Sequence, residues 1–192
     1  MTHPIEADSY AILRRRIDLS HLEPGCRAVV ERIIHASADL DYARSLILDE
    51  TAVKAGIDAL RAGAAVLCDV EMVRAGIGPG PATVCCLPET VAEGERTRSA
   101  AAMALAARRH PDGAVVVVGC APTALVEAVR LAAAGRFRPA LVIGLPVGFV
   151  GAAESKALLR ASSLPSISNV GEKGGSAVAA AAVNALWRLA RE

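Results

Sequence analysis

The sequence predicts an α/β fold in which a mostly parallel sheet lies between two layers of helices. Segments typical of strands alternate with segments typical of helices almost to the C-terminus. The strand segments, such as 114–118 and 140–145, are continuous apolar runs, as expected for strands buried on both faces. No linker or low-complexity stretch interrupts the chain, so residues 1–192 are expected to form one domain.

The individual elements follow from apolar patterns and from glycine and proline positions. Residues 1–19 are polar, and no element is predicted there. Pro24 suits the first position of a helix that is expected to end near Ala38, whereas the glycines and prolines of residues 76–81 predict a loop. The predicted helices cover residues 24–38, 50–62, 70–75, 91–109, 122–134, 151–161 and 174–191, and the predicted strands cover residues 44–48, 65–68, 83–87, 114–118, 140–145 and 166–170.

Composition and charge exclude several classes of protein. The net charge is +1, which gives no electrostatic reason to expect nucleic acid or an anionic membrane as a partner. The longest stretch of small apolar residues, 177–183, is too short to span a bilayer. The N-terminus carries Glu6 and Asp8 and lacks the apolar segment of a signal peptide, so we expect a cytoplasmic protein.

The five cysteines argue against a disulfide scaffold and against a metal site. Their number is odd, and they form neither a Cys-x-x-Cys pair nor a His/Cys ligand spacing. Most of them are expected to be small buried residues in a reducing compartment, and no bound metal is expected.

Two glycine-rich segments lie beside predicted strands. Gly76-x-Gly78-x-Gly80 precedes a strand instead of following one, so it predicts a tight loop and not a dinucleotide-binding turn. Segment 171–176 does lie between a strand and a helix. There Lys173 and the freed backbone N–H groups would suit a carboxylate or a phosphate. The alternative is a plain helix cap, in which Ser176 satisfies the first turn.

Polar and basic residues near the predicted helix starts have two interpretations each. Thr123 would either cap the helix that begins at Pro122 or face a ligand. The arginine runs 14–16 and 95–98 are usually solvated. If they border a crevice, their guanidinium groups would suit a ligand that carries several carboxylates.

His35 lies on the first predicted helix, with Glu31 four residues before it and Asp39 four residues after it. A carboxylate so placed would hold one ring nitrogen and select the tautomer. From the residues alone, a surface histidine is the favoured interpretation, and the spacing indicates no Ser/His/Asp or Cys/His triad.

Several motifs, in order along nearly the whole chain, resemble those of the precorrin-8X methylmutase and cobalt-precorrin-8 methylmutase family. The most specific is the block 143–156, Ile-Gly-Leu-Pro-Val-Gly-Phe-Val-Gly-Ala-Ala-Glu-Ser-Lys. The shorter motifs are residues 5–10, in which a serine precedes an aromatic residue, and residues 32–36, 68–73, 97–102, 121–125 and 173–176.

This resemblance implies a Rossmann-like α/β/α fold and an isomerase of cobalamin biosynthesis. The reaction would move a methyl group from C-11 to C-12 of the corrin ring by a [1,5]-sigmatropic shift, without an organic cofactor, and would yield hydrogenobyrinic acid or its cobalt counterpart. The resemblance implies that His35 protonates or hydrogen-bonds the macrocycle, and that the enzyme is a homodimer with its sites at the subunit interface. The tetrapyrrole is expected to contact Ser9, Arg14, Arg98, Thr123, Lys173, Gly174, Gly175 and Ser176.

The chain departs from the family pattern where the substrate is expected. Cys120 replaces a usual asparagine, Glu172 replaces a usual arginine, and Gly78 stands where threonine is common. A glutamate in place of an arginine would repel a carboxylate-rich substrate. Two alternatives therefore stay open: a non-catalytic tetrapyrrole-binding or carrier protein of the same fold, and a Rossmann-like enzyme that acts on another acidic metabolite.

Overall fold

The computed structural model describes residues 3–92, 94 and 96–192, and it confirms the predicted α/β fold. The described strands form a six-stranded sheet in the order β1-β6-β5-β4-β2-β3. Every neighbouring pair is parallel except β1 with β6, which is antiparallel. The strands are β1 Leu46–Ile47, β2 Ala65–Cys68, β3 Ala82–Val84, β4 Val115–Val118, β5 Leu141–Gly144 and β6 Ser166–Asn169.

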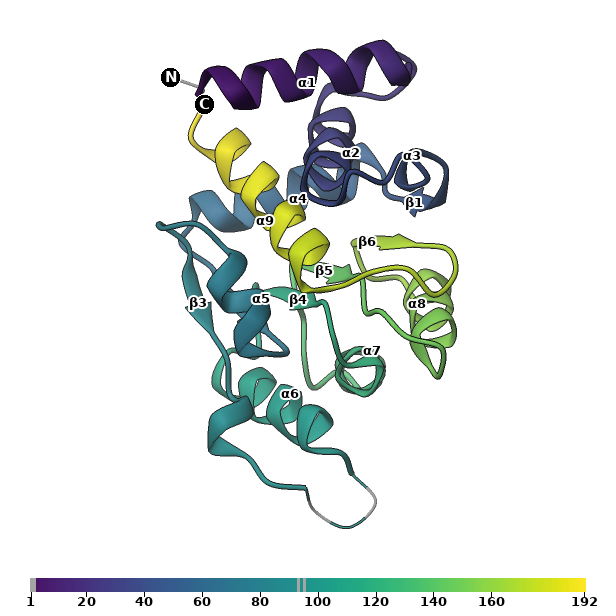
Figure 1. Ribbon diagram of the computed structural model, residues 1–192. Helices are drawn as coiled ribbons and strands as arrows, with labels where there is room; N and C mark the ends of the chain where they lie inside the picture. Colours follow the sequence, from purple (N-terminus) through teal and green to yellow (C-terminus); the bar gives the residue numbers. More distant parts are fainter. Residues whose placement is uncertain (1–2, 93, 95) are drawn as a thin grey trace.

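Helices cover both faces of the sheet (Figure 1), with α6, α7 and α8 on one face and α2, α4 and α9 on the other. Within the part of the chain that the structure describes, no helix is both long and apolar enough to span a membrane. The helices are α1 Pro4–Arg16, α2 Pro24–Ser37, α3 Tyr42–Ser45, α4 Glu50–Arg61, α5 Glu71–Gly76, α6 Arg98–Arg109, α7 Pro122–Ala133, α8 Ala152–Ala161 and α9 Ser176–Ala190, with a 3-10 helix, η1, at Leu87–Glu89.

The central strand β4 shows why its sequence is a continuous apolar run. Val115 and Val117 pack into the core beneath α2, α4 and α9. Val116 and Val118 pack into the second core, beneath α6 and α7. Because successive side chains of a strand point to opposite faces, a strand covered on both sides has to be apolar at every position.

Helix α1 corrects the expectation that residues 1–19 carry no element. It begins with Pro4 at its first turn, and the His3 side chain accepts a hydrogen bond from the Ile5 N–H. Leu13 is its one buried residue, so the helix lacks the apolar stripe by which an amphipathic helix is recognised. Polar contacts with α2 hold it in place instead, and these depend on residues that are far away in the sequence.

Three other elements differ from the prediction. The strand predicted at 83–87 is shorter, since β3 ends at Val84 and η1 begins at Leu87. Helix α6 begins at Arg98 and not at residue 91, because the Thr97 hydroxyl caps it by accepting the Ala100 N–H. The earlier part of that predicted helix includes residues 93 and 95, which lie outside the described residues, and its other residues are not helical. The predicted strand 44–48 is shorter, because α3 occupies its first residues.

The carboxyl ends of the parallel strands meet at one edge of the sheet. The loops after β2, β4, β5 and β6 lie at this edge, and α5, α7, α8 and α9 begin there. Helix N-termini that converge at the carboxyl edge of a parallel sheet are the usual place for an anionic ligand in this class of fold.

Candidate active site

His35 lies near the C-terminal end of α2 and is half-buried. Its Nδ1 atom is 2.8 Å from the Ser9 hydroxyl oxygen on α1. Its ring stacks on that of Tyr10, with centroids 4.9 Å apart and planes inclined by 13°. Helix α1 therefore fixes the imidazole by two neighbouring residues, and among the described residues Nε2 is the ring nitrogen left without a hydrogen-bond partner.

The structure corrects the expectation that a carboxylate on α2 holds His35. Glu31 instead accepts two hydrogen bonds from Arg14, each 2.8 Å long. Asp39 accepts a 2.7 Å bond from the Lys173 ammonium. The hydroxyl of Ser9 takes the place that was expected for a carboxylate, because α1 crosses α2 at this point and presents that serine to the ring.

Two ion pairs hold α1 against α2. Glu31 is buried, and its bidentate pair with Arg14 raises the pKa of that guanidinium. The second pair joins Arg32 to Glu6 at 2.7 Å. Among the predicted substrate-binding residues, Arg14 is thus already committed to a protein carboxylate, and only its remaining N–H groups are left for a ligand.

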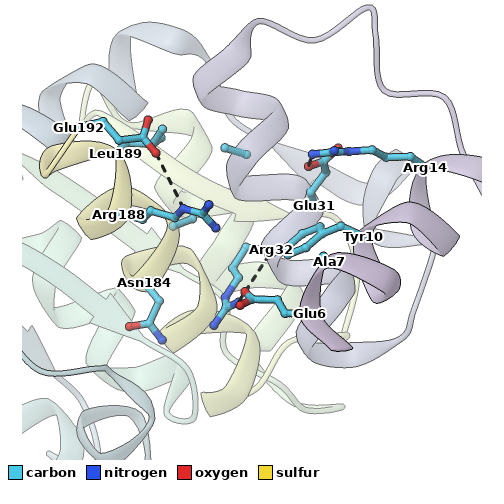
Figure 2. Close-up of a pocket in the computed structure, with 12 residues that line it drawn as sticks. Glu6, Ala7, Tyr10, Arg14, Glu31, Arg32, Asn184, Arg188, Leu189 and Glu192 are labelled. Carbon is cyan, nitrogen blue, oxygen red and sulfur yellow. Dashed lines mark hydrogen bonds and ion pairs between the residues drawn. The ribbon is translucent and has the colours of Figure 1, made fainter. Parts of the chain in front are cut away.

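A cleft of about 860 Å³ lies between α1, α2 and α9 (Figure 2). Arg14 is the one predicted site residue that lines it, so the cleft is not centred on His35. Its walls carry both signs of charge, with Glu6, Arg32, Arg188 and Glu192 among the lining residues that Figure 2 labels.

Asp69 organises the carboxyl edge of the sheet. Only 2% of this residue is exposed, and its carboxylate accepts the backbone N–H groups of Gly119, Cys120 and Ala121 at 3.1, 2.8 and 2.7 Å. Burial raises the pKa of this carboxyl, while the three N–H donors oppose that rise. Asp69 therefore fixes the turn that leads from β4 into α7. Asp69 lies in segment 68–73, one of the motifs that resemble the family, but the sequence alone predicted no role for it.

Thr123 and Arg98 lie together, where α6 and α7 begin. The Thr123 hydroxyl is 2.7 Å from that of Thr97. Arg98 donates from Nε and Nη2 to the carbonyl of Leu87, at 3.1 and 2.9 Å. Thr123 is therefore not the cap of α7, whose N-cap residue is Ala121. The side chains of Thr97 and Thr123 instead link the N-termini of the two helices.

The segment 171–176 forms a tight turn against the loop after β5. Gly174 has no room for a side chain, because a β-carbon there would collide with the carbonyl oxygens of Leu145 and Pro146. Gly175 has a φ of 129°, and its N–H donates to the Leu145 carbonyl at 2.8 Å. The N–H of Gly175 is thus occupied within the protein.

Helix α9 begins at Ser176, and no side chain caps it. The first backbone N–H bonded within the helix is that of Ala179, which donates to Gly175. The backbone N–H groups of residues 176–178 therefore have no partner within the helix, as is usual for the first turn of an uncapped helix. The alternative of Ser176 as a plain cap does not match this geometry.

Lys173 joins the carboxyl edge to the helix that carries His35. Its ammonium lies 2.7 Å from Asp39 and 2.8 Å from Asp41, both just beyond the end of α2. The two carboxylates raise the pKa of Lys173 well above its usual range. The structure thus brings Ser9, Arg14 and His35 into one group, and it links the 171–176 segment to that group through Lys173.

Of the three departures from the family pattern, Cys120 and Glu172 lie on loops at this edge, whereas Gly78 lies in the loop between α5 and β3, at the opposite edge of the sheet. Cys120 and Glu172 are exposed, and the carbonyl of Glu172 accepts the Gly148 N–H at 3.1 Å. The N–H of Gly78 donates to the side-chain oxygen of Asn184 at 2.8 Å. None of the three interrupts a helix or a strand of the sheet.

Sequence reasoning missed four residues that shape the site. Tyr10 had a signal, since an aromatic residue follows Ser9 in the N-terminal motif. Asp69 also lay within a matched motif. Lys156, which holds the backbone of Lys173 together with Asn169, ends the matched block 143–156, but only Asn169 lies outside every matched motif.

Comparisons with known proteins bear on this geometry. The family model described as precorrin-8X methylmutase matches residues 4–189. The chain is 42% identical to the cobalt-precorrin-8 methylmutase of Methanothermobacter thermautotrophicus, over 99% of this chain and 94% of that protein. It is also 42% identical to the precorrin-8X methylmutase of Pseudomonas aeruginosa, over 95% of this chain and 93% of that protein.

A solved structure agrees with these sequence matches. The precorrin-8X methylmutase of Thermus thermophilus superposes with a TM-score of 0.88 at 38% identity, over 97% of this chain and 95% of that one. The match therefore covers the α1–α2 contact as well as the carboxyl edge of the sheet. The chain belongs to the precorrin-8X methylmutase family.

Proposed function

We propose that this methylmutase moves a methyl group from C-11 to C-12 of the corrin ring of precorrin-8X or cobalt-precorrin-8, with His35 as the proton donor. The observation that carries the proposal is the imidazole of His35, which is held between Ser9 and Tyr10 in a chain of this family. Because the chain belongs to a family of methylmutases, an isomerase is favoured over a tetrapyrrole carrier and over an enzyme for another acidic metabolite.

The proposed chemistry needs one positioned proton. In the imidazolium form both ring nitrogens donate, so Nδ1–H bonds to the Ser9 hydroxyl oxygen and Nε2–H is directed to the macrocycle. As the methyl group leaves C-11 and bonds to C-12, a hydrogen bond or proton at the conjugated ring stabilises the shifting electrons. The reaction is an isomerisation, so it consumes no oxidant, reductant or co-substrate.

The substrate's carboxylates would bind at the carboxyl edge of the sheet. The unbonded N–H groups at the start of α9 would attract them, since a helix N-terminus carries a partial positive charge. Lys173 would contribute its ammonium by exchanging its contacts with Asp39 and Asp41 for a substrate carboxylate. Arg98 offers a guanidinium at the start of α6, and its Nη1 group is the one not committed to Leu87. Glu172 opposes this attraction locally and weakens it. Ser9, Arg14, Thr123, Gly174, Gly175 and Ser176 complete the proposed substrate site.

We also propose a homodimer with its active sites at the subunit interface. Phe149 and Val150, in the loop between β5 and α8, are 90% and 88% exposed. The Gly148 N–H ties this loop to the 171–176 segment, so the apolar pair lies beside the proposed site. A two-fold partner would cover such an apolar pair. Light scattering should give twice the 19.7 kDa chain mass, and a 19.7 kDa species alone would contradict the dimer.

A turnover assay tests the proposed reaction. Purified protein would be mixed with precorrin-8X and, in parallel, with cobalt-precorrin-8, and conversion would be followed by absorption without any added cofactor. Both substrates are needed because the relatives at 42% identity include one enzyme named for each. Conversion of at least one substrate is expected. Binding without conversion would indicate a carrier, and the absence of both would overturn the assignment of the substrate.

A further inference from the structure

Lys156 on α8 is a buried charged residue that the proposed chemistry does not use. None of it is exposed, and its ammonium donates to the Asn169 side-chain oxygen at 3.0 Å and to the Lys173 carbonyl at 2.7 Å. Both acceptors are uncharged, and no carboxylate of the described residues forms a salt bridge with it. Burial of an ammonium without a counter-ion disfavours its charged form, and desolvation lowers the pKa of Lys156 to about 8.

Asn169 binds the same carbonyl from the end of β6. It is fully buried, and its side-chain N–H group donates to the Lys173 carbonyl at 2.9 Å. Since a carbonyl oxygen has two lone pairs, Lys156 and Asn169 together satisfy it completely. We call this pair the Lys156–Asn169 clamp. Arg160, one turn beyond Lys156 on α8, donates to the Asn169 carbonyl at 2.9 Å and holds the clamp to the strand.

The clamped carbonyl stands at a junction between the two parts of the site. The peptide after it leads into Gly174, which fits tightly against the Leu145 carbonyl, and then into the start of α9 at Ser176. The side chain of the same Lys173 reaches the exit of α2, where it pairs with Asp39. A rotation of this one peptide would therefore move the N-terminus of α9 and the Lys173 ammonium together.

We propose that Lys156 is a positioning residue for substrate binding: through the Lys173 carbonyl, the Lys156–Asn169 clamp orients the start of α9 toward a substrate carboxylate. This inference rests on the proposed function, because it assumes that the carboxylates bind at this edge. Lys156 acts through Lys173 and does not touch the substrate. His35 receives its support from Ser9 and Tyr10 on α1, so the proton-transfer step is independent of the clamp.

The test compares substrate affinity with turnover. Lys156→Met keeps the length and the apolar stem of the side chain and removes its N–H donors, and Asn169→Ala removes the other half of the clamp. Each variant should raise KM for precorrin-8X, and the dissociation constant of the product hydrogenobyrinic acid, by about tenfold, with kcat within about twofold of wild type. Lys54→Met, which changes an exposed lysine on α4, is the matched control and should behave as wild type.

The double variant distinguishes a joint action of the two residues on one carbonyl from general damage to the fold. Because both residues act on one carbonyl, Lys156→Met with Asn169→Ala should raise KM by much less than the product of the two single effects. Multiplied effects, a folded Lys156→Met with wild-type KM, or a fall in kcat at unchanged KM would each overturn the proposal.

Two further outcomes are also decisive. If Lys156→Met does not fold, Asn169→Ala carries the same expectation, and loss of folding in both would make the clamp part of the folding core and overturn a positioning role. A wild-type protein that neither binds hydrogenobyrinic acid nor converts precorrin-8X would instead contradict the proposed function, and the two failures are thereby distinguished.

Discussion

At the carboxyl edge of the sheet, buried side chains bind backbone groups, whereas on the α1–α2 side the imidazole of His35 is held by side chains of a half-exposed helix. Asp69 and Lys156 are almost completely buried, and each bonds to main-chain atoms of a neighbouring loop. Ser9 and Tyr10 lie on α1, a helix in which Leu13 is the one buried residue. The first region is built into the core, and the second rests on its surface.

Because of this difference, we expect the first region to contribute mainly to stability and the second mainly to turnover. Buried donors and acceptors that lose their partners weaken a fold strongly, because water cannot replace those partners. The Arg32–Glu6 pair that helps to hold α1 is partly exposed, and such pairs contribute about 0–1 kcal/mol. Changes to buried residues at the carboxyl edge should therefore lower stability, and changes to Ser9 or Tyr10 on α1 should lower turnover with little effect on stability.

The largest effect on stability is expected for Asp69→Ala. Its removal leaves the N–H groups of residues 119–121 without their acceptor, which should lower the free energy of unfolding by about 3 kcal/mol and the melting temperature by about 6–12 °C. Calorimetry measures this directly. Asp58→Ala, at an exposed i,i+4 pair, is the control and should melt as wild type does. Equal melting temperatures for both variants would show that Asp69 does not hold the edge.

A second effect at the carboxyl edge depends on pH. The pKa of Lys156 is about 8 in the folded protein and has an ordinary value of 10.5, because burial disfavours its charge, Arg160 adds repulsion and Glu172 partly offsets both. Between these two values the unfolded chain binds more protons. The unfolding free energy of wild type should therefore rise relative to Lys156→Met as the pH increases from 8 to 10.5, by about 1.4 kcal/mol for each pKa unit.

Urea unfolding of both proteins at several pH values measures that difference. Taking the difference between the two proteins removes the contributions of the other titrating groups, which they share. If the difference in unfolding free energy between wild type and Lys156→Met stays constant with pH, or if it falls as the pH rises, the lowered pKa of Lys156 is contradicted.

On the α1–α2 side, Ser9→Ala should lower kcat by about five- to tenfold, since one hydrogen bond to the ring of His35 contributes about 1 kcal/mol. The stacking on Tyr10 remains, so the ring keeps part of its orientation. The melting temperature should match wild type, as should every property of the exposed control Ser20→Ala. A loss of stability comparable to that of Asp69→Ala would remove the contrast between the two regions.

The smallest effect is expected for the exposed charges of the proposed substrate site. Glu172→Arg should lower the dissociation constant of hydrogenobyrinic acid about threefold at low salt, and Arg98→Ala should raise it by a similar factor, with both changes shrinking as salt increases. Asp58→Arg, on the exposed side of α4 near the opposite edge of the sheet, controls for net charge. If both variants bind as wild type does at low salt, the carboxylates bind elsewhere.

The sequence predicted the sheet and its carboxyl edge well, for a physical reason. Strands covered on both faces are apolar at every position, and the loops at their ends need glycine and proline, so both features are local and visible. Gly174 is an example, since the close approach of the Leu145 carbonyl permits no side chain there. The catalytic role of His35 was predicted from the resemblance to a family, because the residues alone favoured a surface histidine.

The partners of the site residues could not be predicted in the same way. Ser9 and His35 are 26 residues apart, and only the packing of α1 on α2 brings them together. Glu31 has the right spacing to reach His35, yet it accepts two hydrogen bonds from Arg14, which the packing of α1 on α2 brings to it. Lys156 looks like an ordinary helix lysine, and its burial depends on the loop that folds over it.

We propose that His35 supplies the proton, while the carboxyl edge of the sheet binds the carboxylates of the substrate. The most direct test is to mix an excess of His35→Ala with precorrin-8X and to follow the absorption over a time in which wild type completes one turnover. We expect that the substrate binds, with the dissociation constant of hydrogenobyrinic acid within about threefold of wild type, and that conversion slows by at least about 100-fold. The exposed control His21→Ala should convert as wild type does. Conversion by His35→Ala at the wild-type rate would contradict the account.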